Sequence, residues 1–374
     1  MHPFASGCGL SHRIWAFEGL ADEGAGEPPN CNEMRTNARR WRQPGQAGGQ
    51  ARFGGGGQAG LYASTGNRVL HIPGRGGMSL AGLSVDVDSV ACHLEGYGFK
   101  RPDDPGEAYD LAIPRALDLF DRLGAQATFF LIAQEAERRP AVVRDIVHRG
   151  HEVASHSLTH TVPFLAQGIE SLRLEVRESK RILDAVSGTS VVGFRAPSWE
   201  GSAGLRRELS AVGYAYDASA FPSILLPALR WSVARLSPNA RKIDVPGTIK
   251  GVFGKTEPWL EQDGSGLFVV IPLATTPLLR LPFYHTMRFL LPASVFASIE
   301  RTTLRRRITP TYVMHAVDFL GVEEDLLDPR ISRHPGMSLG LDAKLAVAEQ
   351  AVRSLASDRS VVPLLAIARD GREA

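Results

Sequence analysis

The chain has few cysteines, no long apolar stretch and no excess of charge of either sign. Its 374 residues include three cysteines, Cys8, Cys31 and Cys92, so we expect no disulfide framework and a reducing compartment. No stretch reaches the roughly 18 apolar residues that a transmembrane helix needs. The formal net charge of +2 argues against the broad basic surface of a nucleic-acid-binding domain.

Residues 1–77 lack lysine and any sustained apolar periodicity. They contain 8 Arg, 5 acidic residues and 17 of the 38 Gly of the chain, a composition that predicts a disordered tail. No apolar run followed by a cleavage site marks a secretory signal, which favours a cytoplasmic protein. Met78 precedes the first regular pattern, so we expect synthesis to start there and a catalytic domain to occupy residues 78–374. The alternative is a translated basic tail that touches anionic surfaces.

From residue 78 onward, short apolar runs alternate with amphipathic segments. We expect strands at 82–88, 127–132, 151–156, 191–197, 214–219, 267–273 and 311–315, a last apolar run at 361–364, and helices at 107–123, 140–150, 168–187, 202–212, 292–304 and 340–356. Residues 222–266 are expected to be irregular. Alternation of this kind indicates a parallel sheet with right-handed crossovers. About seven such units in this length predict a TIM-like barrel.

Two of the expected strands end in residues that can bind a metal ion. Asp86 and Asp88 close the first strand, and His156 and His160 follow the third. The C-terminal ends of parallel strands share one rim, so these four side chains are expected to meet. Two imidazoles and one carboxylate leave open positions on the ion, as in a catalytic zinc site. A non-haem iron oxygenase uses the same ligand types, but its usual all-β sheet disagrees with the βα alternation.

The motifs and their order resemble those of a known family. Ser84–Asp88, His156–His160, Arg195–Trp199, Tyr216–Ser219 and Val313–His315 look like the five motifs of the polysaccharide deacetylases, also called the NodB homology domain or carbohydrate esterase family 4. The resemblance covers about residues 80–320. It implies a distorted (β/α)7 barrel and metal-dependent hydrolysis of an N-acyl group, most often on an amino sugar.

The first motif departs from the usual family pattern of two adjacent aspartates, because Val87 separates them. This resembles a variant subgroup in which the first aspartate is the general base and the second a metal ligand. The resemblance therefore implies that Asp86 is the base and that Asp88, His156 and His160 bind the metal. Residues two apart on a strand point the same way, so both carboxylates can face one ion.

The remaining motifs imply the other catalytic roles. Arg195 would pair with Asp86, and His315 would be the general acid that protonates the departing amine. A backbone N–H in the turn at Ser198 and Trp199 could stabilise the oxyanion. The family often has a second aspartate that tunes the acid histidine, but Ala220 stands there, and Asp318 is the expected substitute.

Further candidates have alternative structural interpretations. Asp217 matches the first aspartate of the fourth motif and is either catalytic or a strand-end cap. Trp199 is either a wall for a sugar ring or part of the core. The substrate-binding candidates are Ser198, Trp199, His93, Glu95, Tyr97 and His285.

The sequence thus predicts a hydrolase that removes an acetyl or formyl group from an amino sugar. One alternative is an amidase for small cyclic amides or imides. Another is a sugar-binding module without activity, but the intact base and acid argue against it. A lipid-linked sugar is a possible substrate, because residues 267–298 combine leucines with Arg280 and Arg288 and could touch a bilayer. The same run is more typical of an ordinary core.

Overall fold

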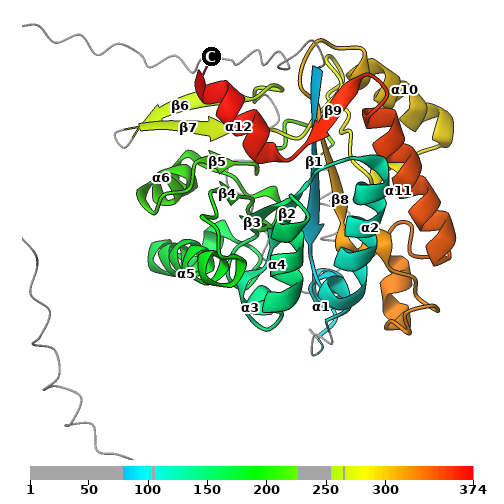
Figure 1. Ribbon diagram of the computed structural model, residues 1–374, viewed down its shortest axis with the longest axis horizontal. Helices are drawn as coiled ribbons and strands as arrows, with labels where there is room; N and C mark the ends of the chain where they lie inside the picture. Colours follow the sequence, from blue (N-terminus) through cyan, green and yellow to red (C-terminus); the bar gives the residue numbers. More distant parts are fainter. Residues whose placement is uncertain (1–78, 101, 103–105, 226–253, 264–265, 374) are drawn as a thin grey trace, which may run out of the picture. The chain divides into compact units, whose positions relative to one another are not determined.

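The computed structural model describes residues 79–100, 102, 106–225, 254–263 and 266–373. The expected tail at 1–77 and most of the irregular stretch at 222–266 lie outside these residues. Figure 1 shows one curled sheet with helices around it. No helix among the described residues is long and apolar enough to cross a membrane.

The sheet follows the predicted alternation. Its strands are β1 (Ser79–Val87), β2 (Thr128–Leu131), β3 (Glu152–Ser155), β4 (Gly193–Phe194), β5 (Tyr216–Asp217), β6 (Trp259–Asp263), β7 (Gly266–Val270), β8 (Thr311–His315) and β9 (Arg359–Val362). They are ordered β6-β7-β5-β4-β3-β2-β1-β8, and β9 also pairs with β1. Every pairing is parallel except β6 with β7.

The predicted distorted barrel is confirmed, although its strand pairing is not closed. No described ladder joins β7 to β8. The segment between them fills this place, since the His285 backbone N–H donates to the Val313 carbonyl at 2.9 Å. β4 and β5 have two residues each, much shorter than expected, and the antiparallel β6 was not predicted.

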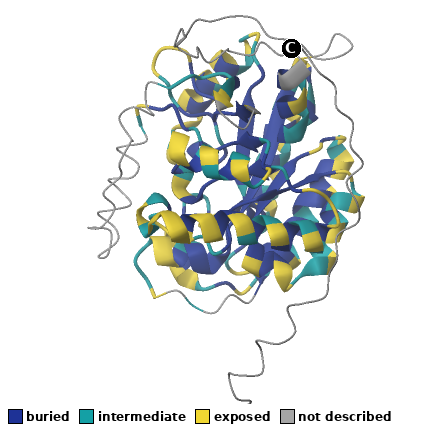
Figure 2. Cartoon of the chain, turned by 90° about the vertical axis from the view of Figure 1, so that its left-hand side faces the viewer, coloured by how far each residue is buried: buried dark blue, intermediate teal, exposed yellow. Residues whose placement is uncertain are grey.

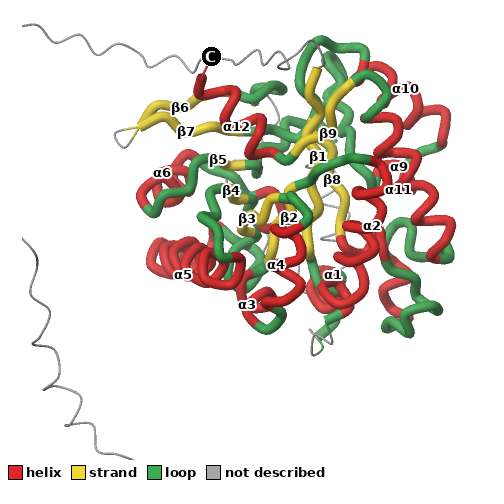
Figure 3. The backbone as a smooth tube through the Cα atoms, viewed as in Figure 1, coloured by secondary structure: helices red, strands yellow, loops and turns green. Residues whose placement is uncertain are grey.

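The helices surround the sheet (Figure 3). They are α1 (Val90–Gly96), α2 (Ile113–Leu123), α3 (Ala133–Glu137), α4 (Pro140–His148), α5 (Ile169–Ser187), α6 (Ala203–Ala211), α9 (Met287–Leu290), α10 (Ala293–Leu304), α11 (Leu341–Leu355) and α12 (Leu364–Glu373). The predicted stop of α2 is confirmed, because Gly124 adopts the left-handed conformation (φ 62°) that ends many helices. α1, α3, α9 and α12 were not expected.

The core lies between the sheet and these helices. β1 is buried over its last seven residues, as a parallel strand covered on both faces should be. Figure 2 shows this arrangement, with buried strands inside and exposed residues on the outer faces of the helices. The strand ends are therefore held rigidly, which suits side chains that must keep a fixed geometry.

Candidate metal and active site

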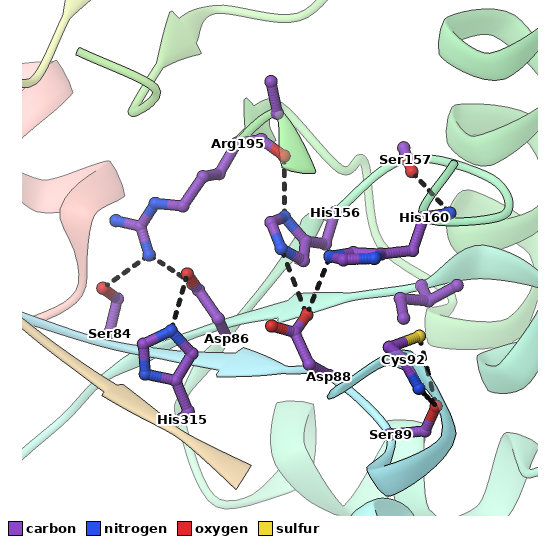
Figure 4. A network of polar contacts seen from close by, with 12 residues as sticks. Ser84, Asp86, Asp88, Ser89, Cys92, His156, Ser157, His160, Arg195 and His315 are labelled. Carbon is purple, nitrogen blue, oxygen red and sulfur yellow. Dashed lines mark hydrogen bonds and ion pairs between the residues drawn. The ribbon is translucent and has the colours of Figure 1, made fainter. Parts of the chain in front are cut away.

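Strand register brings the predicted site residues together. Asp86 on β1 pairs with His315 on β8, and Ser155 on β3 pairs with Phe194 on β4. The next residues after these last two are His156 and Arg195. All four chemistry-bearing side chains thus project from neighbouring strand ends, as Figure 4 shows.

Three side chains form a group that can hold a metal ion. Oδ1 of Asp88 lies 3.2 Å from Nε2 of His156 and 3.3 Å from Nε2 of His160. One ligand atom from each residue lies within 4.8 Å of the other two. The predicted ligand set therefore converges, with two nitrogens and one oxygen in the combination typical of catalytic zinc.

The polar contacts of these three residues fit a cation. Oδ1 of Asp88 is buried and has no hydrogen-bond donor among the described residues. Burial alone would raise the pKa of Asp88, but His160 and His156 outweigh it and hold this pKa well below its usual value. Nδ1 of His156 lies 2.8 Å from the Arg195 carbonyl. If that nitrogen carries the proton, Nε2 presents its lone pair towards Asp88.

The loop between the two histidines is held by a buried glutamate on α5. The Glu175 carboxylate accepts the backbone N–H groups of Leu158 (2.8 Å) and Thr159 (3.1 Å), and also the Thr159 hydroxyl (2.5 Å). Glu175 is therefore a positioning residue that holds the loop between His156 and His160. No sequence motif indicates this role.

Positive φ angles concentrate around the site. Ser157 (72°), His160 (60°), Ser198 (53°) and Trp199 (59°) all adopt the left-handed region, which costs a residue other than glycine about 1–3 kcal/mol. The left-handed conformations of Ser157 and His160 make the chain turn tightly between them. The Ser157 hydroxyl accepts the His160 N–H at 3.0 Å. The two imidazoles are thus brought together by a tight loop.

Asp86 is paired with arginine, as predicted. Nη1 of Arg195 donates to Oδ1 of Asp86 and to the Ser84 hydroxyl at 3.1 Å. The guanidinium lies between the Phe130 ring, 4.0 Å from its centroid, and the Trp199 ring at 4.6 Å. This clamp holds Asp86 in one orientation beside the metal-binding group.

His315 lies on the other side of Asp86 from His156 and His160 (Figure 4). Its Nε2 is 4.0 Å from Oδ2 of Asp86. Oδ2 of Asp318 accepts the His315 backbone N–H at 2.8 Å. Asp318 therefore fixes the main chain at the end of β8, a different contact from the expected tuning of the imidazole.

Two predicted site residues, Asp217 and His285, make buried contacts of a structural kind. Oδ1 of Asp217 accepts the Ser219 backbone N–H at 2.8 Å, and Oδ2 lies 3.5 Å from Arg206, which favours the strand-end cap over a catalytic role. The assignment of His285 to substrate binding stays a prediction. His285 is fully buried, because its backbone pairs with β8, and its Nδ1 lies 3.1 Å from the Tyr312 hydroxyl.

The turn at Ser198 and Trp199 differs from the expectation in one respect. The Trp199 N–H donates to the Ala196 carbonyl at 3.1 Å, so this amide is occupied within the turn, and the oxyanion donor stays a prediction. Trp199 packs 5.4 Å from the Phe221 ring and is half-buried. Its ring is both a cover for Arg195 and a partly exposed wall.

His93 and Tyr97 from α1 gather around a histidine that the sequence analysis missed. The Tyr97 hydroxyl lies 3.0 Å from Nδ1 of His334, whose ring centroid is 4.6 Å from that of His93. The His93 ring lies 6.3 Å from His315. Burial lowers the pKa of His93 to about 4, so it is neutral at pH 7. Glu95 is exposed, and its predicted role in substrate binding stays a prediction.

Comparison with known proteins agrees with this geometry. The sequence model described as polysaccharide deacetylase matches residues 104–216, a range that contains His156, His160 and Arg195 but ends before His315. This segment of the chain is similar to the polysaccharide deacetylase family.

Individual family relatives match only part of the chain. A peptidoglycan deacetylase of Helicobacter pylori strain ATCC 700392 / 26695 is 32% identical over 144 residues, which cover 37% of this chain and 49% of that protein. The chain thus matches about half the length of this relative.

Solved structures show that the fold extends over most of the chain. A Mycobacterium smegmatis protein assigned as a polysaccharide deacetylase aligns with a TM-score of 0.51 and 18% identity, over 82% of this chain and 96% of that one. Puue allantoinase aligns with a TM-score of 0.50 and 16% identity, over 80% and 92%. At these identities the likeness concerns the fold alone.

Proposed function

We propose that the protein is a zinc-dependent deacetylase that removes N-acetyl groups from amino sugars in a polysaccharide. The observation that carries this proposal is the position of the Asp86–Arg195 pair beside Asp88, His156 and His160. A base and a metal-binding group on one rim are the parts that amide hydrolysis by water requires. The Helicobacter pylori relative, named for deacetylation of peptidoglycan, supports an acetylated sugar polymer as the substrate class.

The residues divide the reaction between them. When bound, the divalent ion would polarise the amide carbonyl and increase the acidity of water. Asp86, oriented by its ion pair with Arg195, takes a proton from the attacking water as the C–O bond forms. His315 then donates a proton to the amide nitrogen as the C–N bond breaks, which releases acetate and a free amine. Nε2 of His315 lies 4.0 Å from Oδ2 of Asp86, so the acid and the base can both reach the same amide.

The surroundings favour an uncharged, hydroxyl-bearing substrate. Tyr97 and the neutral His93 each offer groups that can donate or accept hydrogen bonds, while Trp199 offers a ring face. These are groups that suit a sugar. The expected cytoplasmic location stays a prediction.

The test is a substrate screen with metal analysis. Purified protein, stripped of metal and then reloaded with zinc, is assayed for acetate release from N-acetylglucosamine oligomers and from peptidoglycan, with formyl-sugars and cyclic amides such as hydantoin and allantoin as parallel arms. Zinc-dependent acetate release supports the proposal. Turnover of the cyclic amides alone would overturn it in favour of a cyclic amidase, and oxygen uptake with iron would point to an oxygenase.

A further inference from the structure

A surface far from the catalytic rim combines exposed leucines with arginines. The turn between Thr276 and Leu281 follows β7, and its two central leucines project into solvent. Leu278 is 92% exposed and Leu279 is 63% exposed. Isolated exposed leucines are common, but two adjacent ones at the tip of a turn form a continuous apolar protrusion.

The protrusion lies beside an apolar groove. This groove has a volume of about 290 Å³ and separates the turn from α10. Its lining includes Thr276, Leu278, Leu279, Leu281, Val295 and Ile299. Val295 on α10 is itself 41% exposed, so the apolar surface continues from the turn onto the helix. We call the turn, the groove and the outer face of α10 the leucine–arginine face.

The charge of this segment is strongly one-sided. Residues 276–307 contain six arginines and one acidic residue, Glu300, which gives 6 − 1 = +5, against +2 for the whole chain. Glu300 is paired with Arg288, and Arg306 is paired with Glu257 at 3.0 Å. Three further arginines are exposed and have no ion pair among the described residues: Arg301, Arg305 and Arg307.

The leucine–arginine face is at the opposite end of the strands from the catalytic residues. The Ala274 N–H donates to the hydroxyl of Thr311 at 3.1 Å, and Thr311 is the first residue of β8, whereas His315 is the last. At about 3.3 Å per residue, β8 alone separates these two positions by about 13 Å. In Figure 1, α10 accordingly lies at the end of the sheet where β1 begins.

We propose that the leucine–arginine face docks the protein on an anionic lipid bilayer, with Leu278 and Leu279 inserted at the headgroup boundary. Apolar side chains at a tip contribute burial in the interface, and surrounding arginines add attraction to anionic headgroups. The charge complementarity favours lipid over a second copy of this chain, which would bring the same arginines together. The sequence analysis predicted that residues 267–298 as a whole could touch a bilayer. The structure limits this contact to part of the run, because Val269 is fully buried.

Docking through this face turns the catalytic rim away from the bilayer. A lipid-linked sugar whose acyl group stays near the headgroups would be out of reach, whereas a polymer extending from the surface would be within reach. The docking proposal concerns a separate surface, so it does not depend on the proposed deacetylase activity.

The experiment is co-sedimentation of the full chain with vesicles. Vesicles of phosphatidylcholine alone and with 30 mol% phosphatidylglycerol (roughly physiological anionic content) are compared at low and high salt. We expect binding to the anionic vesicles only, and weaker binding at high salt, because salt screens the arginines. The double variant Leu278→Asp, Leu279→Asp should lower the partition coefficient at least about tenfold.

The matched control is Leu326→Asp, since Leu326 is 90% exposed but lies outside the leucine–arginine face. It should bind vesicles like the wild type, and all variants should keep wild-type melting temperatures and activity on a soluble substrate. Three results would overturn the proposal: no binding of the wild type to anionic vesicles, equal loss in the control, or a wild-type dimer that the double variant dissolves. Salt-sensitive binding to nucleic acid without vesicle binding would also overturn it.

Discussion

Replacing each aspartate of the first motif with asparagine separates the base from the metal ligand. The change keeps the shape of the side chain and removes its negative charge. Asp88 contacts both histidines, so Asp88→Asn should lower zinc content well below one ion per chain. Asp86 contacts Arg195 and has no hydrogen bond or ion pair to His156 or His160 among the described residues. Asp86→Asn should therefore retain zinc and still lose activity.

For Asp86→Asn, the structure allows an estimate of the loss of activity and of the loss of folding stability. Loss of a general base lowers kcat by about 10²- to 10⁴-fold. Arg195 has a side chain only 2% exposed, and removing the partner of a buried charge costs about 3–5 kcal/mol of folding stability. In Asp86→Asn, Arg195 keeps its hydrogen bond to Ser84 and its contacts with the two flanking rings. The expected loss of folding stability is therefore near the lower end of this range. A domain with about 5–15 kcal/mol of stability still folds.

The assay measures zinc per chain by mass spectrometry after dialysis, together with the rate of acetate release and the unfolding free energy in urea. Asp217→Asn is the matched control, because Asp217 is an equally buried carboxylate at the end of a neighbouring strand. It should lose stability and keep zinc and specific activity. The reasoning is refuted if Asp86→Asn loses zinc while Asp88→Asn retains it.

Three further changes test other parts of the site. His315→Gln should lower kcat by about 10²-fold or more at unchanged zinc content, since it removes the proton donor; an unchanged rate would exclude His315 as the acid. Glu175→Gln should destabilise the protein by about 1–3 kcal/mol and weaken zinc binding, measured by chelator competition, because the carboxylate holds the ligand loop; unaltered zinc affinity would contradict this. Burial lowers the pKa of His285 to about 4, so between pH 7 and pH 5 the unfolded chain gains a proton that the folded chain does not, and stability falls by about 2 kcal/mol through this residue. His285→Gln should remove that part of the pH dependence in urea unfolding, and identical slopes for both proteins would disprove it.

The sequence predicted the parts of the fold that depend on local patterns. The strand at 311–315 and the helix at 168–187 were placed within one residue, because apolar periodicity and glycine stops specify them. β4 and β5 were predicted too long. Their apolar residues are buried, but only two residues of each pair in a ladder. β6 was missed because its antiparallel pairing with β7 depends on a contact between segments, which periodicity does not report.

The same division holds for the site. Asp88, His156 and His160 were predicted correctly to meet, because strand ends and their register determine where these residues lie. Glu175 and His334 were missed, since each reaches the site from a helix or loop without a motif. His285 was named as a substrate-binding candidate from outside the motifs, and the sequence gives no sign of the backbone bond to Val313 on β8 that holds it in the core. Roles that depend on tertiary packing are invisible in a one-dimensional pattern.

The two uses of Arg195 have a consequence for how the protein tolerates motion. Its side chain contacts Asp86 and its carbonyl contacts His156, so one residue at the end of β4 positions both the proposed base and a proposed metal ligand. A small displacement of that strand would carry Asp86 and His156 along together and preserve their spacing. Moving Asp86 without moving His156 would require a change at a residue other than Arg195. Arg195 is therefore a poor position at which to alter substrate preference.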